Sequence, residues 1–383
     1  MQPKAEDERI RQGTAKTLTV GCIFLVILLF SALASFPHPA QAANTTTITV
    51  GNEPSTVAIA PNGAHAYIAH YVNGSVSVLD LATNKVTATV TTGSLGSKPD
   101  GAAVTPNNNY VYVTNCGSNS VSVVDAASNS LAATIPVGSY PVGVAITPNG
   151  KYAYVANEVS NSASVINTAS NSVTTTITGL TDAWGVAISH SGAYAYVTDA
   201  GNRSVSVIST ASNTVTATVT VGNEPFGVAI SPNDKYVYVV NNINDSVSVI
   251  NAATNTVTAT VGVGRAPGNV ALTPNGKYAY VTNEFSQSLS VIDTATNEVT
   301  STVPVMGNPD VVAANPNGLY IYVAIGIKGI IQVIDTPAAP ASNLFLSAVE
   351  WTILIVVIVV AVLLMGIVLR RRRSRKTQPP QTM

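Results

Sequence analysis

The chain has 383 residues, of which 46% are hydrophobic and only 10% are charged, and its formal net charge is −1. This near-neutral total hides an uneven distribution, because ten of the 18 Lys and Arg residues lie before residue 17 or after residue 369. Between residues 43 and 343, 15 acidic residues outnumber eight basic ones, which argues against a nucleic-acid-binding surface. Cys22 lies in an apolar segment and Cys116 is alone in the polar part of the chain, so no useful disulfide is expected.

The first apolar segment resembles an export signal. Residues 18–36 are nearly all apolar, follow a basic start and precede Ala40-Gln41-Ala42, which matches a small-residue cleavage site. We expect residues 1–42 to be a signal peptide. The alternative is an uncleaved signal anchor, which the long leading region favours. Either interpretation exports the chain that follows.

The second apolar segment predicts a membrane anchor. Residues 351–369 carry no charge, are long enough to cross a bilayer, and are followed at once by a run rich in arginine. Because basic residues stay on the cytoplasmic side, we predict a transmembrane helix over residues 344–369 and a cytoplasmic tail over residues 370–383. The protein is then expected in the cell membrane, with one span, or with two if the N-terminal segment is uncleaved. A nucleic-acid role for the arginine run is disfavoured by its position beside the span.

Seven copies of one motif lie between these segments. Each copy contains an alternating run of the Tyr-x-Tyr-Val type, which reads His-Ala-Tyr-Ile in the first copy, and the equivalent tyrosines are spaced by 45 residues once and by 42 residues five times: Tyr67, Tyr112, Tyr154, Tyr196, Tyr238, Tyr280 and Tyr322. Four short runs with period-2 patterning, separated by turn residues, predict four strands per copy. Such a repeat is typical of a propeller blade, so we predict an all-β, seven-bladed β-propeller of four-stranded blades over residues 44–335.

The seventh copy lacks its fourth strand. Its third strand ends near residue 335 and runs into the linker of residues 336–343, where prolines disfavour a central strand. Residues 46–51 match the fourth strand of another copy, residues 217–222, position by position. We therefore expect the N-terminal strand to complete the last blade and to close the ring.

The sequence Tyr-Val-Thr-Asn occurs at residues 112–115 and 280–283, with close variants at residues 154–157 and 196–199. Through these copies the chain resembles the YVTN-family β-propeller repeats of archaeal and bacterial surface-layer proteins. The resemblance implies a cell-surface role but no catalytic residues, because the motif is structural. Propellers of related sequence include lactonase-type enzymes, and that resemblance of fold does not establish an activity.

The copies differ most where the first strand of each blade enters the central channel. The equivalent position there is Ser55, Asp100, Val142, Trp184, Phe226, Gly268 or Asp310. The residue two positions earlier in each copy is Glu53, Lys98, Tyr140, Asp182, Glu224, Ala266 or Asn308. Aromatic rings beside carboxylates predict a site for a sugar, a cationic ligand or a cation, with these candidate residues: Asp100, Trp184, Phe226, Asp310, Glu224 and Glu53. The alternative is that the aromatics plug the channel and the acids are merely solvated.

The loops between the second and third strands are expected on the same face of the ring, here termed the top face. Asparagines such as Asn115 begin these loops and are expected to cap them through hydrogen bonds to the backbone. Candidate glycosylation sequons begin there at Asn73, Asn202 and Asn244. The acids Glu158, Asp199 and Glu284 also lie there and could bind calcium, but without a contiguous ligand loop we expect no cofactor.

No catalytic centre is evident. Of the four histidines only His70 is expected on the top face, and no spacing suggests a zinc site. We therefore expect a non-catalytic surface protein for adhesion, surface-layer display or binding of an extracellular protein or glycan, with its top face pointing away from the membrane. The alternative is a lactonase-like hydrolase or lyase that uses Asp100 and Asp310 with a metal at the channel mouth.

Overall fold

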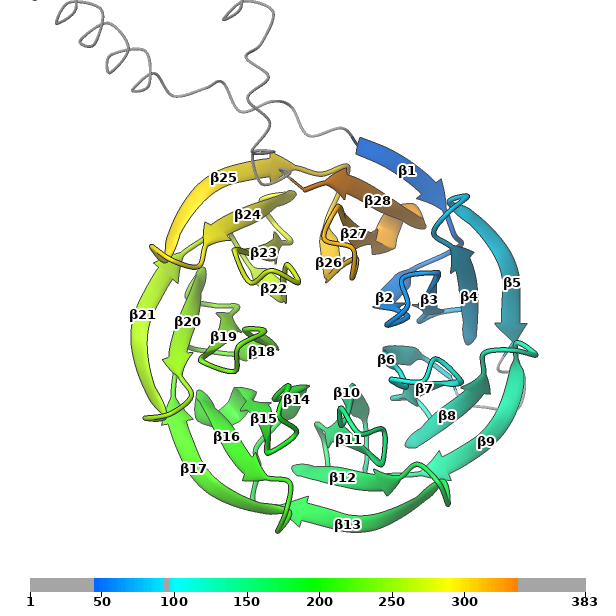
Figure 1. Cartoon of the computed structure of the whole chain (residues 1–383), viewed down its shortest axis with the longest axis horizontal. Helices are drawn as coiled ribbons and strands as arrows, with labels where there is room; N and C mark the ends of the chain where they lie inside the picture. Colours follow the sequence, from blue (N-terminus) through cyan, green and yellow to red (C-terminus); the bar gives the residue numbers. More distant parts are fainter. Residues whose placement is uncertain (1–44, 92–96, 337–383) are drawn as a thin grey trace, which may run out of the picture. The chain divides into compact units, whose positions relative to one another are not determined.

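The computed structural model describes residues 45–91 and 97–336, which form seven four-stranded antiparallel sheets arranged in a ring (Figure 1). The predicted signal segment, transmembrane helix and tail, and the linker after Thr336, lie outside these residues. Among the residues described, no helix is long and apolar enough to cross a membrane. The prediction of an all-β propeller with seven four-stranded blades is confirmed.

The first four blades each use four consecutive strands. Blade 1 contains β2 (Pro54–Ile59), β3 (His65–His70), β4 (Ser75–Asp80) and β5 (Lys85–Thr91). Blade 2 contains β6 (Pro99–Val104), β7 (Tyr110–Asn115), β8 (Ser120–Asp125) and β9 (Ser130–Pro136). Blade 3 contains β10 (Pro141–Ile146), β11 (Tyr152–Asn157), β12 (Ser162–Asn167) and β13 (Ser172–Thr178). Blade 4 contains β14 (Ala183–Ile188), β15 (Tyr194–Asp199), β16 (Ser204–Ser209) and β17 (Thr214–Thr220).

The remaining three blades include the one that closes the ring. Blade 5 contains β18 (Pro225–Ile230), β19 (Tyr236–Asn241), β20 (Ser246–Asn251) and β21 (Thr256–Gly262). Blade 6 contains β22 (Pro267–Leu272), β23 (Tyr278–Asn283), β24 (Ser288–Asp293) and β25 (Glu298–Pro304). Blade 7 contains β26 (Pro309–Ala314), β27 (Tyr320–Ile325), β28 (Ile330–Asp335) and the N-terminal β1 (Thr45–Thr49). Single 3-10 turns lie at η1 (Ala200–Asn202) and η2 (Gly326–Lys328).

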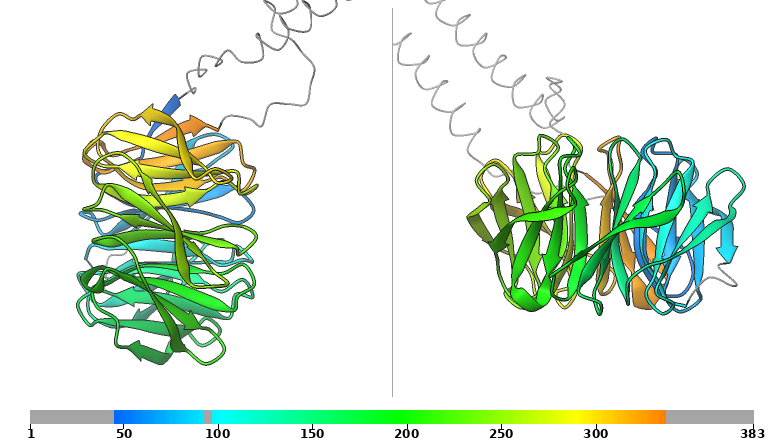
Figure 2. Two further views of the ribbon diagram at one scale, coloured as in Figure 1. Left: turned by 90° about the vertical axis from the view of Figure 1, so that its left-hand side faces the viewer. Right: turned by 90° about the horizontal axis from the view of Figure 1, so that it is seen from below.

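The predicted closure is confirmed. Strand β1 pairs antiparallel with β28, with Thr45 opposite Ile334 and Thr49 opposite Ile330. Ile48 is buried against Ile68 of blade 1, so the N-terminal strand also packs on the first blade. Figure 2 shows the blades in one layer, with hairpin loops on both flat faces.

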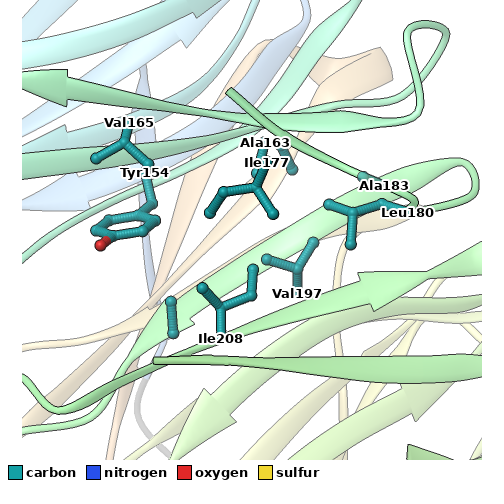
Figure 3. Packing of buried hydrophobic residues seen from close by; sticks show 10 residues of the cluster. Tyr154, Ala163, Val165, Ile177, Leu180, Ala183, Val197 and Ile208 are labelled. Carbon is teal, nitrogen blue, oxygen red and sulfur yellow. The ribbon is translucent and has the colours of Figure 1, made fainter. Parts of the chain in front are cut away.

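The period-2 pattern determines which side chains are buried. The two middle strands of each blade are buried on both faces because neighbouring blades pack against them, whereas the outer strand exposes most of its residues. Figure 3 shows one such seam, where Tyr154 and Ile177 of blade 3 meet Val197 and Ile208 of blade 4. The core therefore consists of seven apolar seams between blades.

The threonine of the Tyr-Val-Thr-Asn motif joins neighbouring blades. Thr114 Oγ1 donates a hydrogen bond to the carbonyl of Val142 in blade 3, at 2.7 Å, and accepts one from the amide of Gly101, at 2.8 Å. Thr198 and Thr282 make the equivalent bonds to the carbonyls of Phe226 and Asp310. These carbonyls belong to three channel positions, so the motif holds the backbone from which Val142, Phe226 and Asp310 project.

The asparagine of the motif has a different role from the one expected. Asn115 is fully buried, and its Nδ2 donates to Ser122 Oγ at 2.6 Å. Asn157 and Asn283 make the same bond to Ser164 and Ser290. The prediction of loop caps formed with the backbone was wrong for these three residues, because the alternating serines of the third strand offer closer partners. It is confirmed for Asn241, whose Oδ1 accepts a hydrogen bond from the Gly222 amide at 3.0 Å.

Candidate functional site

All seven channel positions predicted from the repeat line one cavity of about 630 Å³. Of the six candidate residues, five belong to its wall: Asp100, Trp184, Phe226, Asp310 and Glu53. Glu224 is not part of the wall. The structure thus brings most of the predicted set together, although their participation in binding stays a prediction.

A strained turn precedes most of the channel residues. In six of the seven blades the residue two positions before the channel residue is left-handed, although none of the six is glycine: Glu53, Lys98, Tyr140, Asp182, Glu224 and Ala266. A left-handed conformation costs a non-glycine residue about 1 kcal/mol. The turn is held because its carbonyl accepts a hydrogen bond from the top loop of the same blade, as in Tyr71 N to Glu53 O at 3.1 Å.

Glycines behind the channel positions allow the inner strands to approach each other closely. A Cβ atom on Gly101 would lie 2.3 Å from the Val142 carbonyl oxygen, and one on Gly185 would lie 2.4 Å from that of Phe226. No side chain fits at such distances. These glycines therefore keep the inner strands of neighbouring blades close enough to form one continuous wall.

The wall has an aromatic side. The rings of Trp184 and Phe226 stack with centroids 4.6 Å apart and an interplanar angle of 26°. They project from β14 and β18, the inner strands of blades 4 and 5, which lie across the ring from blade 1 (Figure 1). An offset stack of this kind presents a broad apolar and electron-rich surface to the cavity.

The opposite side is acidic. Asp100 of blade 2 and Asp310 of blade 7 flank blade 1, and Glu53 and Glu284 also line the cavity. None of the described residues in its wall is a lysine or arginine. Lys98 lies two residues before Asp100 in the sequence but is not part of the wall. Its ammonium lies 5.4 Å from the ring centre of Tyr71.

Burial and mutual repulsion raise the pKa values of these acids. Burial, followed by repulsion from Asp310 and Glu158, raises the pKa of Asp100 to about 7. Desolvation by the channel walls, with repulsion from Glu284 and Glu53, raises the pKa of Asp310 to about 6. The Asp310 side chain is nevertheless exposed to solvent, so it is the more readily ionised of the two. Near neutral pH Asp100 therefore retains its proton more readily than Asp310 does.

Two tyrosines that sequence reasoning did not select cover the region beside Asp100. The hydroxyls of Tyr71 in blade 1 and Tyr140 before blade 3 are 3.2 Å apart. Both interact with the buried thiol of Cys116 in blade 2, whose pKa is raised by burial and by Asp100. Only the departure of these positions from the repeat consensus could have indicated this bridge, because its partners are 69 residues apart.

The other top-face predictions fall on separate loops. Asn73, Asn202 and Asn244 are exposed, but Asn202 Nδ2 donates to Thr181 Oγ1 at 2.7 Å and Asn244 Oδ1 accepts from the Asn223 amide. Their glycosylation stays a prediction.

The three acids suggested as calcium ligands do not form one cluster. Asp199 is buried and accepts a hydrogen bond from Ser206, whereas Glu158 and Glu284 belong to the loops of blades 3 and 6. Within residues 45–91 and 97–336, no three His, Cys, Asp or Glu side chains form a group that could hold a metal. Metal binding therefore stays untested.

Residues 34–262 match the model of a family described as "Lactonase, 7-bladed beta-propeller". The chain belongs to this family. Residues 229–334 also match a YNCE-like β-propeller family, so together the two matches cover the ring. These family matches support the propeller and leave the surface-layer resemblance as a prediction.

A solved structure titled Kuenenia stuttgartiensis hydrazine synthase has a similar fold, with a TM-score of 0.68 and 25% sequence identity. The similarity covers 76% of this chain and 97% of that one. No curated protein sequence matches the chain. The family and this neighbour both carry the names of enzymes, so they give no support to the expectation that the propeller is non-catalytic.

Proposed function

We propose that the protein is a membrane-anchored cell-surface receptor that binds an organic cation at the mouth of the propeller channel. The observation that carries this proposal is the division of one cavity into an aromatic side, Trp184 and Phe226, and an acidic side with Asp100 and Asp310. A quaternary or protonated amine is attracted by both sides. Each favourable aromatic contact contributes about 0.5–2 kcal/mol, depending on desolvation.

The absence of a basic residue from the described wall strengthens the argument. A carboxylate that already had a lysine or arginine partner would gain little from a ligand, whereas acids that repel one another gain from any cation placed between them. Binding of a cation lowers the pKa of Asp100 and draws the residual proton from it. Affinity should therefore increase as the pH rises through the range of about 6 to 7.

The proposed location of the propeller at the cell surface rests on the sequence. Residues 1–42 supply export, residues 344–369 supply the anchor, and the Tyr-Val-Thr-Asn copies resemble surface-layer repeats. Protease accessibility of the propeller on intact cells tests this location separately from ligand binding. Protection of the whole chain would contradict it.

The ligand class is tested by calorimetry on the full-length protein in phosphatidylcholine nanodiscs. We expect benzyltrimethylammonium to bind and its neutral carbon isostere to bind at least about tenfold more weakly. Trp184→Ala and Asp310→Asn should each weaken amine binding by about tenfold, whereas Glu298→Gln on the outer strand β25 should not change it. Equal binding of the amine and its isostere would contradict the proposal.

A hydrolase is the second candidate, and family membership together with one observation favours it. Asp100, with a pKa of about 7, and Asp310, with a pKa of about 6, repel each other on the acidic side of the mouth and could share general acid and base roles. Lactone hydrolysis by the purified protein, measured with and without added divalent cations and lost in Asp310→Asn, would favour this function. Full activity in that variant would reject it.

A further inference from the structure

The most exposed large apolar side chains in the described structure occupy a single position of the repeat. Five of the seven loops between the second and third strands carry one, and these side chains are 57–81% exposed: Val72, Val159, Ile243, Phe285 and Ile327. No other large apolar side chain among the residues described exceeds 52% exposure. We refer to these five residues as the apolar crown.

The fold does not require apolar residues at this position. In blades 2 and 4 the equivalent residues are Gly117 and Gly201, so the loop between the second and third strands also forms without a side chain at this position. The crown residues belong to none of the seven core clusters. Repeated exposure of large apolar side chains without a folding role is typical of an interaction surface.

The crown adjoins the acidic mouth. The residue directly before each crown position faces the cavity in blades 1, 5, 6 and 7, and one of these is the acid Glu284. Ile327 of the crown itself lines the cavity. Apolar and acidic groups therefore lie beside each other on the top face, with carboxylates in the cavity wall and four of the five crown residues in that wall or directly after a residue of it.

We propose that the crown and the mouth together form a docking surface for a protein partner that presents a lysine or arginine flanked by apolar side chains. This inference rests on the proposed cation-binding mouth and specifies its ligand as a side chain of a polypeptide. The basic group enters the cavity between Asp100, Asp310 and the Trp184–Phe226 stack, and the flanking apolar residues cover the crown.

Charge complementarity selects this partner over two others. A second copy docked crown to crown would bring the two acidic mouths together, which repulsion opposes. An anionic lipid surface would meet the same carboxylates and be repelled. A basic group surrounded by apolar residues satisfies both parts of the surface at once, and interfaces commonly combine such anchors.

The test is selection of a random displayed-peptide library on the full-length protein in phosphatidylcholine nanodiscs. We expect enriched peptides to contain a lysine or arginine next to leucine, isoleucine or aromatic residues. For a synthesised enriched peptide, the double variant Phe285→Ser/Ile327→Ser should lower affinity by about tenfold or more. Asp310→Asn should lower it by a similar factor. Replacement of the basic residue by norleucine should do the same.

The matched control is Val215→Ser/Val257→Ser, which removes exposed apolar side chains from the outer strands β17 and β21. Peptide affinity should not change in this variant. Both double variants should keep the wild-type melting temperature, because the altered side chains are exposed.

The possible failures are distinguishable. If benzyltrimethylammonium binds but no peptide is enriched, or enriched peptides bind the crown variant as tightly as wild type, the docking surface is wrong and the cation-binding mouth stands. Enrichment of purely apolar or acidic peptides also overturns the docking proposal. Failure of the amine itself to bind rejects the proposed function. Self-association of the protein that is lost in the crown variant would assign the crown to a second copy and overturn the inference.

Discussion

Asp100 and Asp310 lie on either side of Ser55 in the ring of channel positions, and their properties depend on this arrangement. The repeat register was sufficient to place both residues in the channel, since equivalent positions in a repeat occupy equivalent places. Their raised pKa values could not be predicted in the same way, because they arise from burial and from acids of other blades. Glu224 was selected from its charge and its place two residues before a channel position, and it is not part of the cavity wall, although Glu53 at the equivalent position of blade 1 is.

Replacing the Asp100 carboxyl should stabilise the protein at alkaline pH. Because the folded state raises the pKa of Asp100 from 3.8 to about 7, the folded protein binds more protons than the unfolded chain between these values, and stability falls as the pH rises through them. We expect Asp100→Asn to increase the free energy of unfolding by about 1–2 kcal/mol at pH 8 and by little at pH 4. Thermal unfolding across this range measures the effect.

Glu298→Gln, which alters an exposed carboxylate of β25, is the control for a general charge effect. A stability difference between Asp100→Asn and wild type that is the same at pH 4 and pH 8 would show that burial of Asp100 does not control its ionisation.

The elements of the fold were largely predictable, and their connections were less so. Four strands per copy and the closing strand followed from alternation and from the match between the two ends of the repeat. The hydrogen bond from Thr114 to the Val142 carbonyl, which joins blades 2 and 3, could not be predicted, because hydrogen bonds between blades leave no pattern in one sequence. The hydrogen bond between Tyr71 and Tyr140 could not be predicted either, because its partners belong to different loops.

Loss of the Thr114 hydrogen bonds should destabilise the ring. Thr114→Val keeps the shape of the side chain but leaves the Val142 carbonyl and the Gly101 amide without this partner, at a cost of about 1–3 kcal/mol. Chemical denaturation measures the change. Thr218→Val, on the exposed face of the outer strand β17, should change stability by less than about 0.5 kcal/mol. Similar effects of the two substitutions would contradict a specific role for the Thr114 hydrogen bonds.

Removal of the closing strand should open the propeller. Deletion of residues 45–51 leaves β28 with an unpaired edge and exposes the apolar surface that Ile48 covers. We expect a lower melting temperature and concentration-dependent association, detected by light scattering of the full-length protein. A monomeric deletion variant with wild-type melting behaviour would show that β1 is not needed for closure.

At the scale of the whole molecule, seven nearly identical blades carry one asymmetric mouth. Strand alternation maintains the ring in every blade, close glycines and buried threonine hydroxyls add to it in some blades, and the variable channel positions create an acidic side and an aromatic side. The sequence alone revealed this division between scaffold and site. It did not reveal the apolar crown, because a single valine or phenylalanine in a loop is ordinary and only the exposure at equivalent positions makes the set distinctive.

In the proposed function the mouth binds a cation through carboxylates that must first ionise. Calorimetric titration of the full-length protein with benzyltrimethylammonium at pH 5 and pH 8 tests it most directly. The pKa values of about 6 and 7 predict binding at pH 8 that weakens by about tenfold or more at pH 5, and Asp310→Asn should reduce this dependence. Equal affinity at the two pH values, or no binding at pH 8, would contradict the account.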